Sequence, residues 1–164
     1  MNKILLIREL AEKAMAAETV RADRLCGRAE KWTAGIIVVT GFQLVCAPNV
    51  LGSGSYWAEG AFYLALAALA LSLPLGFQAM RSKGYADYPR GDKLWETLKP
   101  DNVSPDAAEE AIIQMLLKNR EQNAKLNDAK DRSLSQCAWL LFAGFLLVII
   151  SQLLAPLAVI SPPQ

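Results

Sequence analysis

Residues 137–160 read CAWLLFAGFLLVIISQLLAPLAVI, a stretch that contains no charged side chain. A helix rises about 1.5 Å per residue, so about 20 such residues cross the ~30 Å hydrocarbon core of a bilayer. Two further segments, roughly 32–50 and 61–80, meet the same requirement. The sequence therefore predicts an all-α membrane protein with three transmembrane helices.

A buried core helix is the alternative explanation for any one of these segments. The chain has 164 residues, and three apolar segments leave too little polar sequence to cover all of them in water. The membrane interpretation is therefore favoured.

The basic residues indicate the orientation of the spans. All 17 Lys and Arg residues lie in two blocks, one ending at Lys31 and one running from Arg81 to Arg132. The loop of residues 48–60 between the first two spans contains none. Because Lys and Arg accumulate in cytoplasmic loops, we expect a cytoplasmic N-terminus and an external C-terminus.

The pattern divides the chain into five parts. We expect a cytoplasmic amphipathic helix over 1–31, a transmembrane hairpin over 32–80, a cytoplasmic loop and long helix over 81–136, a third span over 137–160, and an external tail over 161–164. The stripe predicted for the first helix is Leu6, Leu10, Ala14, Ala17, Arg21 and Leu25.

A long helix is expected to begin after Ser104, because Ser is a favoured N-cap and Pro105 suits the first helical position. Its buried stripe is predicted to contain Ile112, Met115 or Leu116, Asn119, Asn123, Leu126, Lys130 and Ser133. We expect this helix to form an antiparallel cytoplasmic stalk with the N-terminal helix. Asn119 and Asn123, one turn apart, are candidates to set the helix register, as buried polar residues do in coiled coils, or they face water.

Composition and motifs favour a non-enzymatic protein without a cofactor. The chain has no histidine and no nucleotide-binding or hydrolase signature. Its three scattered cysteines do not predict a metal site. A net charge of +1 does not favour a nucleic-acid partner.

Uncharged polar residues within the spans are the remaining functional candidates. They are Thr40 and Gln43 in the first span, Ser72 and, near the end, Gln78 in the second, and Ser151 and Gln152 in the third, with Gln43, Ser72, Ser151 and Gln152 as the main candidates. They either form hydrogen bonds between helices or line the pore of an oligomer.

The second span is also rich in small residues that permit close helix packing, namely Ala61, Ala65, Ala68 and Gly76. Pro74 either kinks this span or marks the break where it leaves the bilayer.

Four basic residues follow the second span: Arg81, Lys83, Arg90 and Lys93. They are candidates for contact with anionic lipid or with the phosphate of a nucleotide.

One run of sequence resembles a known group of proteins. Asn119-Arg-Glu-Gln-Asn123-Ala-Lys125-Leu126 is followed by Lys130-Asp-Arg132-Ser-Leu134 and then directly by Cys137-Ala-Trp-Leu-Leu. This run is similar to the segment before the last helix of SLATT-type and Pycsar-type transmembrane effectors of bacterial anti-phage nucleotide-signalling systems.

The resemblance implies an oligomer in the bacterial inner membrane that disrupts or permeabilises that membrane when triggered. It also implies a cytoplasmic signalling partner or a nucleotide second messenger as the trigger. Two alternatives remain open: a membrane anchor or adaptor for a cytoplasmic partner, and a holin-like phage protein, which typically has the opposite orientation.

Overall fold

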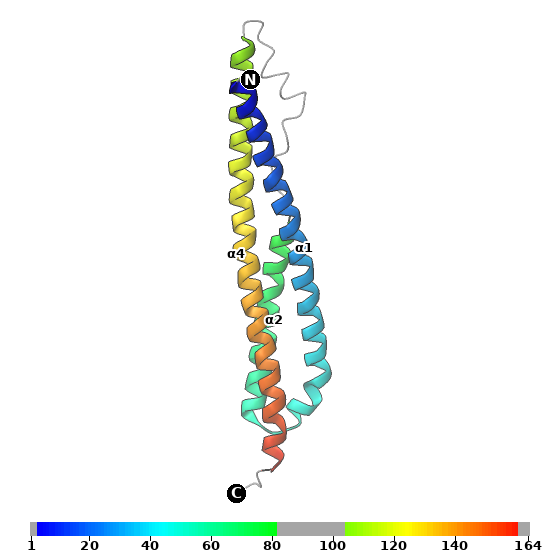
Figure 1. Cartoon of the computed structure of the whole chain (residues 1–164). Coiled ribbons are helices and arrows are strands. Elements are labelled where there is room, and N and C mark those ends of the chain that lie inside the picture. Colours follow the sequence, from blue (N-terminus) through cyan, green and yellow to red (C-terminus); the bar gives the residue numbers. More distant parts are fainter. Residues whose placement is uncertain (1–2, 82–103, 161–164) are drawn as a thin grey trace. The chain divides into compact units, whose positions relative to one another are not determined.

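The computed structural model describes residues 3–81 and 104–160, and within these ranges it contains three helices and no strand. Helix α1 spans Lys3–Leu51, α2 spans Tyr56–Met80 and α4 spans Pro105–Ile160 (Figure 1). All three are long and apolar enough to cross a membrane. The predicted all-α class with three membrane helices is therefore confirmed at this level.

A tight turn joins α1 to α2. The Gly52 N–H donates to the carbonyl of Pro48 at 3.0 Å, and Gly54 has a φ of 68°, which glycine adopts without a steric penalty. Ser55 then caps α2 by accepting a hydrogen bond from the Ala58 N–H at 3.4 Å.

The predicted start of the long helix is confirmed. The Ser104 hydroxyl accepts a hydrogen bond from the Ala107 N–H at 3.3 Å, and Pro105 is the first helical residue. Helix α2 continues through Pro74 to Met80, so the alternative of a break at this proline is not observed.

The structure divides into two units. Among the described residues, unit 1 contains α1 up to Leu25 and α4 up to Ala129. Unit 2 contains α1 from Cys26 onward, the whole of α2, and α4 from Lys130 onward.

The two helices of unit 1 run in the same direction, so the expected antiparallel stalk is wrong. Arg8 pairs with Glu109 at 3.8 Å, and Arg21 pairs with Asp128 at 2.8 Å. The residue numbers of the partners rise together, which occurs only between parallel helices. The reason is topological: a chain with one returning helix between two others runs in the same direction in the first and the third.

The core of unit 1 contains Ile112 and Leu116 of the stripe predicted for the long helix, but it differs from the stripe predicted for the first helix. Ala11, Met15 and Leu116 are buried together, with Ile112 packed against them. On α1, the predicted Leu6 and Leu10 are 40% and 58% exposed. The first helix carries more than one apolar stripe, and its sequence alone does not say which stripe faces a partner.

Unit 2 is a bundle in which α2 returns between two parallel helices (Figure 1). Ile36 of α1, Leu69 of α2 and Leu141 of α4 form one cluster, and Val50, Ala58 and Ala155 belong to a second. From Leu134 onward, the buried positions of α4 recur at alternating spacings of three and four, which is the repeat of a left-handed coiled coil. These positions are Leu134, Cys137, Leu141, Gly144, Val148, Ser151 and Ala155.

Candidate functional site

The polar residues predicted within the spans lie inside unit 2. Gln43, Ser72 and Ser151 are fully buried. The side-chain amide of Gln43 crosses from α1 to α2, where its Nε2 donates to the carbonyl of Phe62 at 2.7 Å. One of the two predicted roles, a hydrogen bond between helices, is therefore observed for Gln43 in the single chain.

The two serines are satisfied within their own helices. Ser72 Oγ donates to the carbonyl of Leu69 at 2.6 Å, and Ser151 Oγ donates to the carbonyl of Val148 at 2.8 Å. Such bonds to the preceding turn let a hydroxyl occupy an apolar core without a partner on another helix.

Three buried polar atoms have no hydrogen-bond partner among the residues that the structure describes. They are Thr33 Oγ1, Gln43 Oε1 and Gln152 Nε2. A buried polar group without a partner typically costs about 1–3 kcal/mol, so these atoms destabilise the arrangement in which they are found. Gln152 also borders a cavity of about 510 Å³ between α1 and α4, together with Asn49 and Ser53.

The small residues predicted to pack in α2 are buried or half-buried in the bundle. Ala61, Ala65 and Gly76 are buried, and Ala68 is half-buried. A Cβ atom added at Gly76 would lie 2.6 Å from Thr33 Oγ1, so the glycine is required by the approach of α1. Sequence reasoning missed Gly144 of α4, where an added Cβ would lie 3.0 Å from the side chain of Leu69.

A buried asparagine joins the two helices of unit 1, but it is not one of the two predicted. Asn127 is fully buried, and its Nδ2 donates to the carbonyl of Glu18 at 2.9 Å and to Glu18 Oε2 at 2.8 Å. Asn123 is also buried, whereas Asn119 is half-buried. The sequence spacing indicates Asn127 as a further candidate, because Asn119, Asn123 and Asn127 recur every four residues.

Lys130 is the one lysine among the buried residues of the described chain, being 8% exposed. Burial lowers its pKa, and the nearby thiol of Cys26 opposes this effect. Lys130 was predicted to lie on the buried stripe of its helix, and the structure places it there.

Of the four basic candidates after the second span, only Arg81 lies within the described residues. Arg81 is exposed, and its backbone N–H donates to the carbonyl of Gln78 at 3.3 Å at the end of α2. Lys83, Arg90 and Lys93 lie outside the described residues.

The described side chains do not form a cluster of three or more metal-binding residues. No protein-family model, no curated protein and no solved structure matches the chain. The features of the described chain that bear on function are the three apolar helices, the buried polar groups and the helix pair of unit 1.

Proposed function

We propose that the chain is an oligomeric, non-enzymatic effector of an anti-phage defence system that permeabilises the bacterial inner membrane when triggered. The observation that carries this proposal is the apolar surface left uncovered by the single chain. The most apolar windows of α1, α2 and α4 are 17%, 33% and 22% buried, respectively. Lipid and further copies of the chain would cover the remainder.

In this proposal the N-terminus and unit 1 are cytoplasmic and the C-terminus is external. The support is the distribution of Lys and Arg, which are absent from the turn between α1 and α2. Unit 1 would receive the trigger, either a cytoplasmic partner or a nucleotide second messenger. Helices α1 and α4 contribute residues to both units, so they are the routes by which a signal would reach the spans.

The buried polar groups constrain how such a membrane leak would open. Gln43, Ser72 and Ser151 face the interior of one bundle, so they line a water path only after the helices of that bundle rearrange. The trigger must then bind the rearranged state more tightly than the closed one. The unpartnered Gln43 Oε1 and Gln152 Nε2 lower the cost of leaving the closed state, because they have no bonds to lose there.

A second function, an anchor or adaptor for a cytoplasmic partner, is favoured by the same internal bonding. If Gln43 serves only to hold α1 to α2, the bundle has no need to open. A holin-like role requires the opposite orientation, and a C-terminal tag reached by reagents from the cytoplasm would revive it.

The decisive experiment follows membrane potential, cell growth and phage titre after induced expression, with and without phage infection. We expect infection to collapse the potential in cells that contain the wild-type chain. Gln43→Leu or Gln152→Leu should abolish the collapse, because each removes a polar group from the water path. Gln78→Leu is the matched control, since it deletes the same amide from an exposed position on α2.

An unchanged potential and an unchanged phage titre in infected cells would overturn the effector proposal in favour of the adaptor. A collapse that is unaffected by either core glutamine substitution would retain the effector function but refute the proposed water path.

A further inference from the structure

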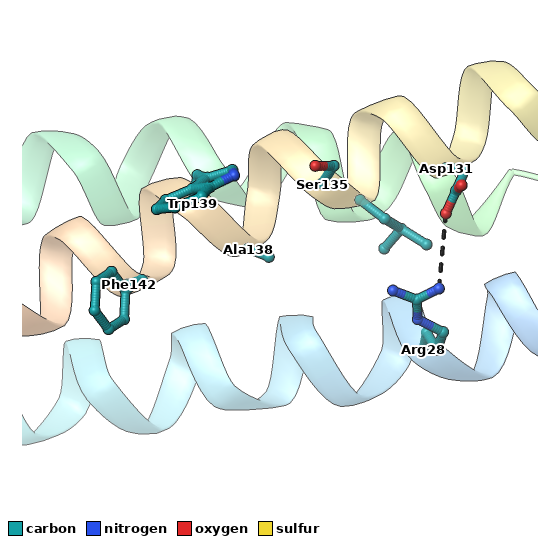
Figure 2. Close-up of a pocket in the computed structure, with 7 residues that line it drawn as sticks. Arg28, Asp131, Ser135, Ala138, Trp139 and Phe142 are labelled. Carbon is teal, nitrogen blue, oxygen red and sulfur yellow. Dashed lines mark ion pairs between the residues drawn. The ribbon is translucent and has the colours of Figure 1, made fainter.

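A groove between α1 and α4 in unit 2 has one charged end and one aromatic end. Its volume is about 570 Å³. Figure 2 shows Arg28 and Asp131 pointing toward each other at one end, and Trp139 and Phe142 at the other, with Ser135 between them.

The two side chains at the charged end of the groove are not hydrogen-bonded to each other. Arg28 Nη1 lies 3.6 Å from Asp131 Oδ1, which is too long for a hydrogen bond, and the two side chains are 59% and 49% exposed. Within the described chain, Arg21 and Asp128 make the contrasting pair, since they are joined by a hydrogen bond of 2.8 Å. The Arg28 guanidinium and the Asp131 carboxylate therefore retain donors and acceptors for a ligand.

The aromatic end is exposed although it is apolar. Trp139 is 71% exposed and Phe142 is 54% exposed. Their rings are arranged edge to face, with 6.3 Å between the ring centroids. From Asp131 to Phe142 the helix rises about 16 Å at ~1.5 Å per residue. Because the third span is expected to begin near residue 137, about half of this length lies in the headgroup region and about half in the hydrocarbon core.

We propose that this groove binds a phospholipid whose headgroup carries both a phosphate and a primary ammonium, as in phosphatidylethanolamine. The phosphate accepts hydrogen bonds from Arg28, the ammonium donates to Asp131, and an acyl chain lies against Trp139 and Phe142. The proposal depends on membrane insertion of the three helices and not on the effector function.

Charge complementarity selects this class of lipid. Adjacent opposite charges in the groove match a headgroup that also carries adjacent opposite charges. A phosphatidylglycerol headgroup has neutral hydroxyl groups where phosphatidylethanolamine has its ammonium, so it leaves the negative charge of Asp131 without a cationic partner. A phosphatidylcholine headgroup has a cation without an N–H, so it cannot donate a hydrogen bond to the carboxylate.

The test is native mass spectrometry of the full chain in mild detergent, with the three lipids supplied at equal concentration and with identical acyl chains. We expect phosphatidylethanolamine to bind roughly tenfold more tightly than the other two, as one charge-assisted hydrogen bond allows. Asp131→Asn should remove this preference, Asp131→Glu should retain it, and Arg28→Gln should weaken the binding of all three lipids.

Asp128→Asn is the matched control, because it removes a carboxylate from the same helix outside the groove. Its lipid preference should equal that of the wild type. Equal binding of the three lipids by the wild-type chain would overturn the proposal without recourse to any variant. A preference that survives Asp131→Asn, in a variant with unchanged helicity and melting temperature, would also overturn it.

Discussion

The contact between Gly76 and Thr33 allows a double-mutant test of the packing in unit 2. In Gly76→Ala, the new Cβ atom would lie 2.6 Å from Thr33 Oγ1, well inside van der Waals contact. Overpacking of this kind costs about 1–3 kcal/mol. Alanine in place of glycine within a helix recovers about 1 kcal/mol. We therefore expect Gly76→Ala alone to reduce the free energy of unfolding by up to about 2 kcal/mol.

Removal of the opposing hydroxyl should reverse this effect. Thr33→Ala deletes a buried Oγ1 that has no hydrogen-bond partner in the described chain, which offsets the loss of one methyl group. In the Thr33→Ala background, Gly76→Ala should retain only its helix-propensity gain of about 1 kcal/mol. The coupling energy between the two positions should then be about 1–3 kcal/mol.

The measurement is thermal unfolding of the four chains in one detergent, followed by far-UV circular dichroism. A change of 1 kcal/mol should shift the melting temperature by about 2–4 °C in a chain of this length. Gly60→Ala is the matched control on the same helix, because a Cβ at position 60 meets nothing within 4 Å. Additive effects at positions 33 and 76, within about 0.5 kcal/mol, would refute the proposed contact.

Two further substitutions test the polar groups. Asn127→Ala should lower the free energy of unfolding by about 1–3 kcal/mol, since it removes two bonds to Glu18, whereas exposed Gln114→Ala should leave it nearly unchanged. Equal melting temperatures for these two variants would show that Asn127 does not secure the helix pair. Lys130→Met should raise the melting temperature at neutral pH, because burial lowers the Lys130 pKa and disfavours its charged form. Between that lowered pKa and the ordinary value of 10.5, the unfolded chain binds more protons than the folded chain, so the stability of the wild type rises with pH. The stability advantage of Lys130→Met over the wild type should therefore shrink toward pH 10.5. An advantage of equal size at pH 7 and near pH 10.5 would contradict this reasoning.

Local chemistry was sufficient to predict the helices. The uncharged run of 137–160 requires an apolar environment along its whole length, and Ser104 with Pro105 satisfies the first free N–H groups of α4. These are properties of neighbouring residues, so no tertiary information was needed.

Which face of each helix is buried was decided only by tertiary structure. The sequence predicted Leu6 and Leu10 on the stripe of the first helix, yet the parallel pairing of α1 with α4 buries Ala11 and Met15 instead. It offered Asn119 and Asn123 as residues that set the register or face water; the structure buries Asn123, and it adds Asn127, which bonds to Glu18. When a helix has several apolar or polar stripes, its own sequence does not determine which stripe is buried. The direction and register of the partner helix determine it.

The same distinction applies to the candidate site. The sequence identified Gln43 as a polar residue within a span, because an amide among apolar neighbours is visible in one dimension. That its Nε2 bonds to the carbonyl of Phe62 while its Oε1 finds no described partner is a consequence of how α1 meets α2. Likewise, Arg28 and Asp131 are about one hundred positions apart in the sequence. Only the packing of α1 against α4 brings them together at the charged end of the groove.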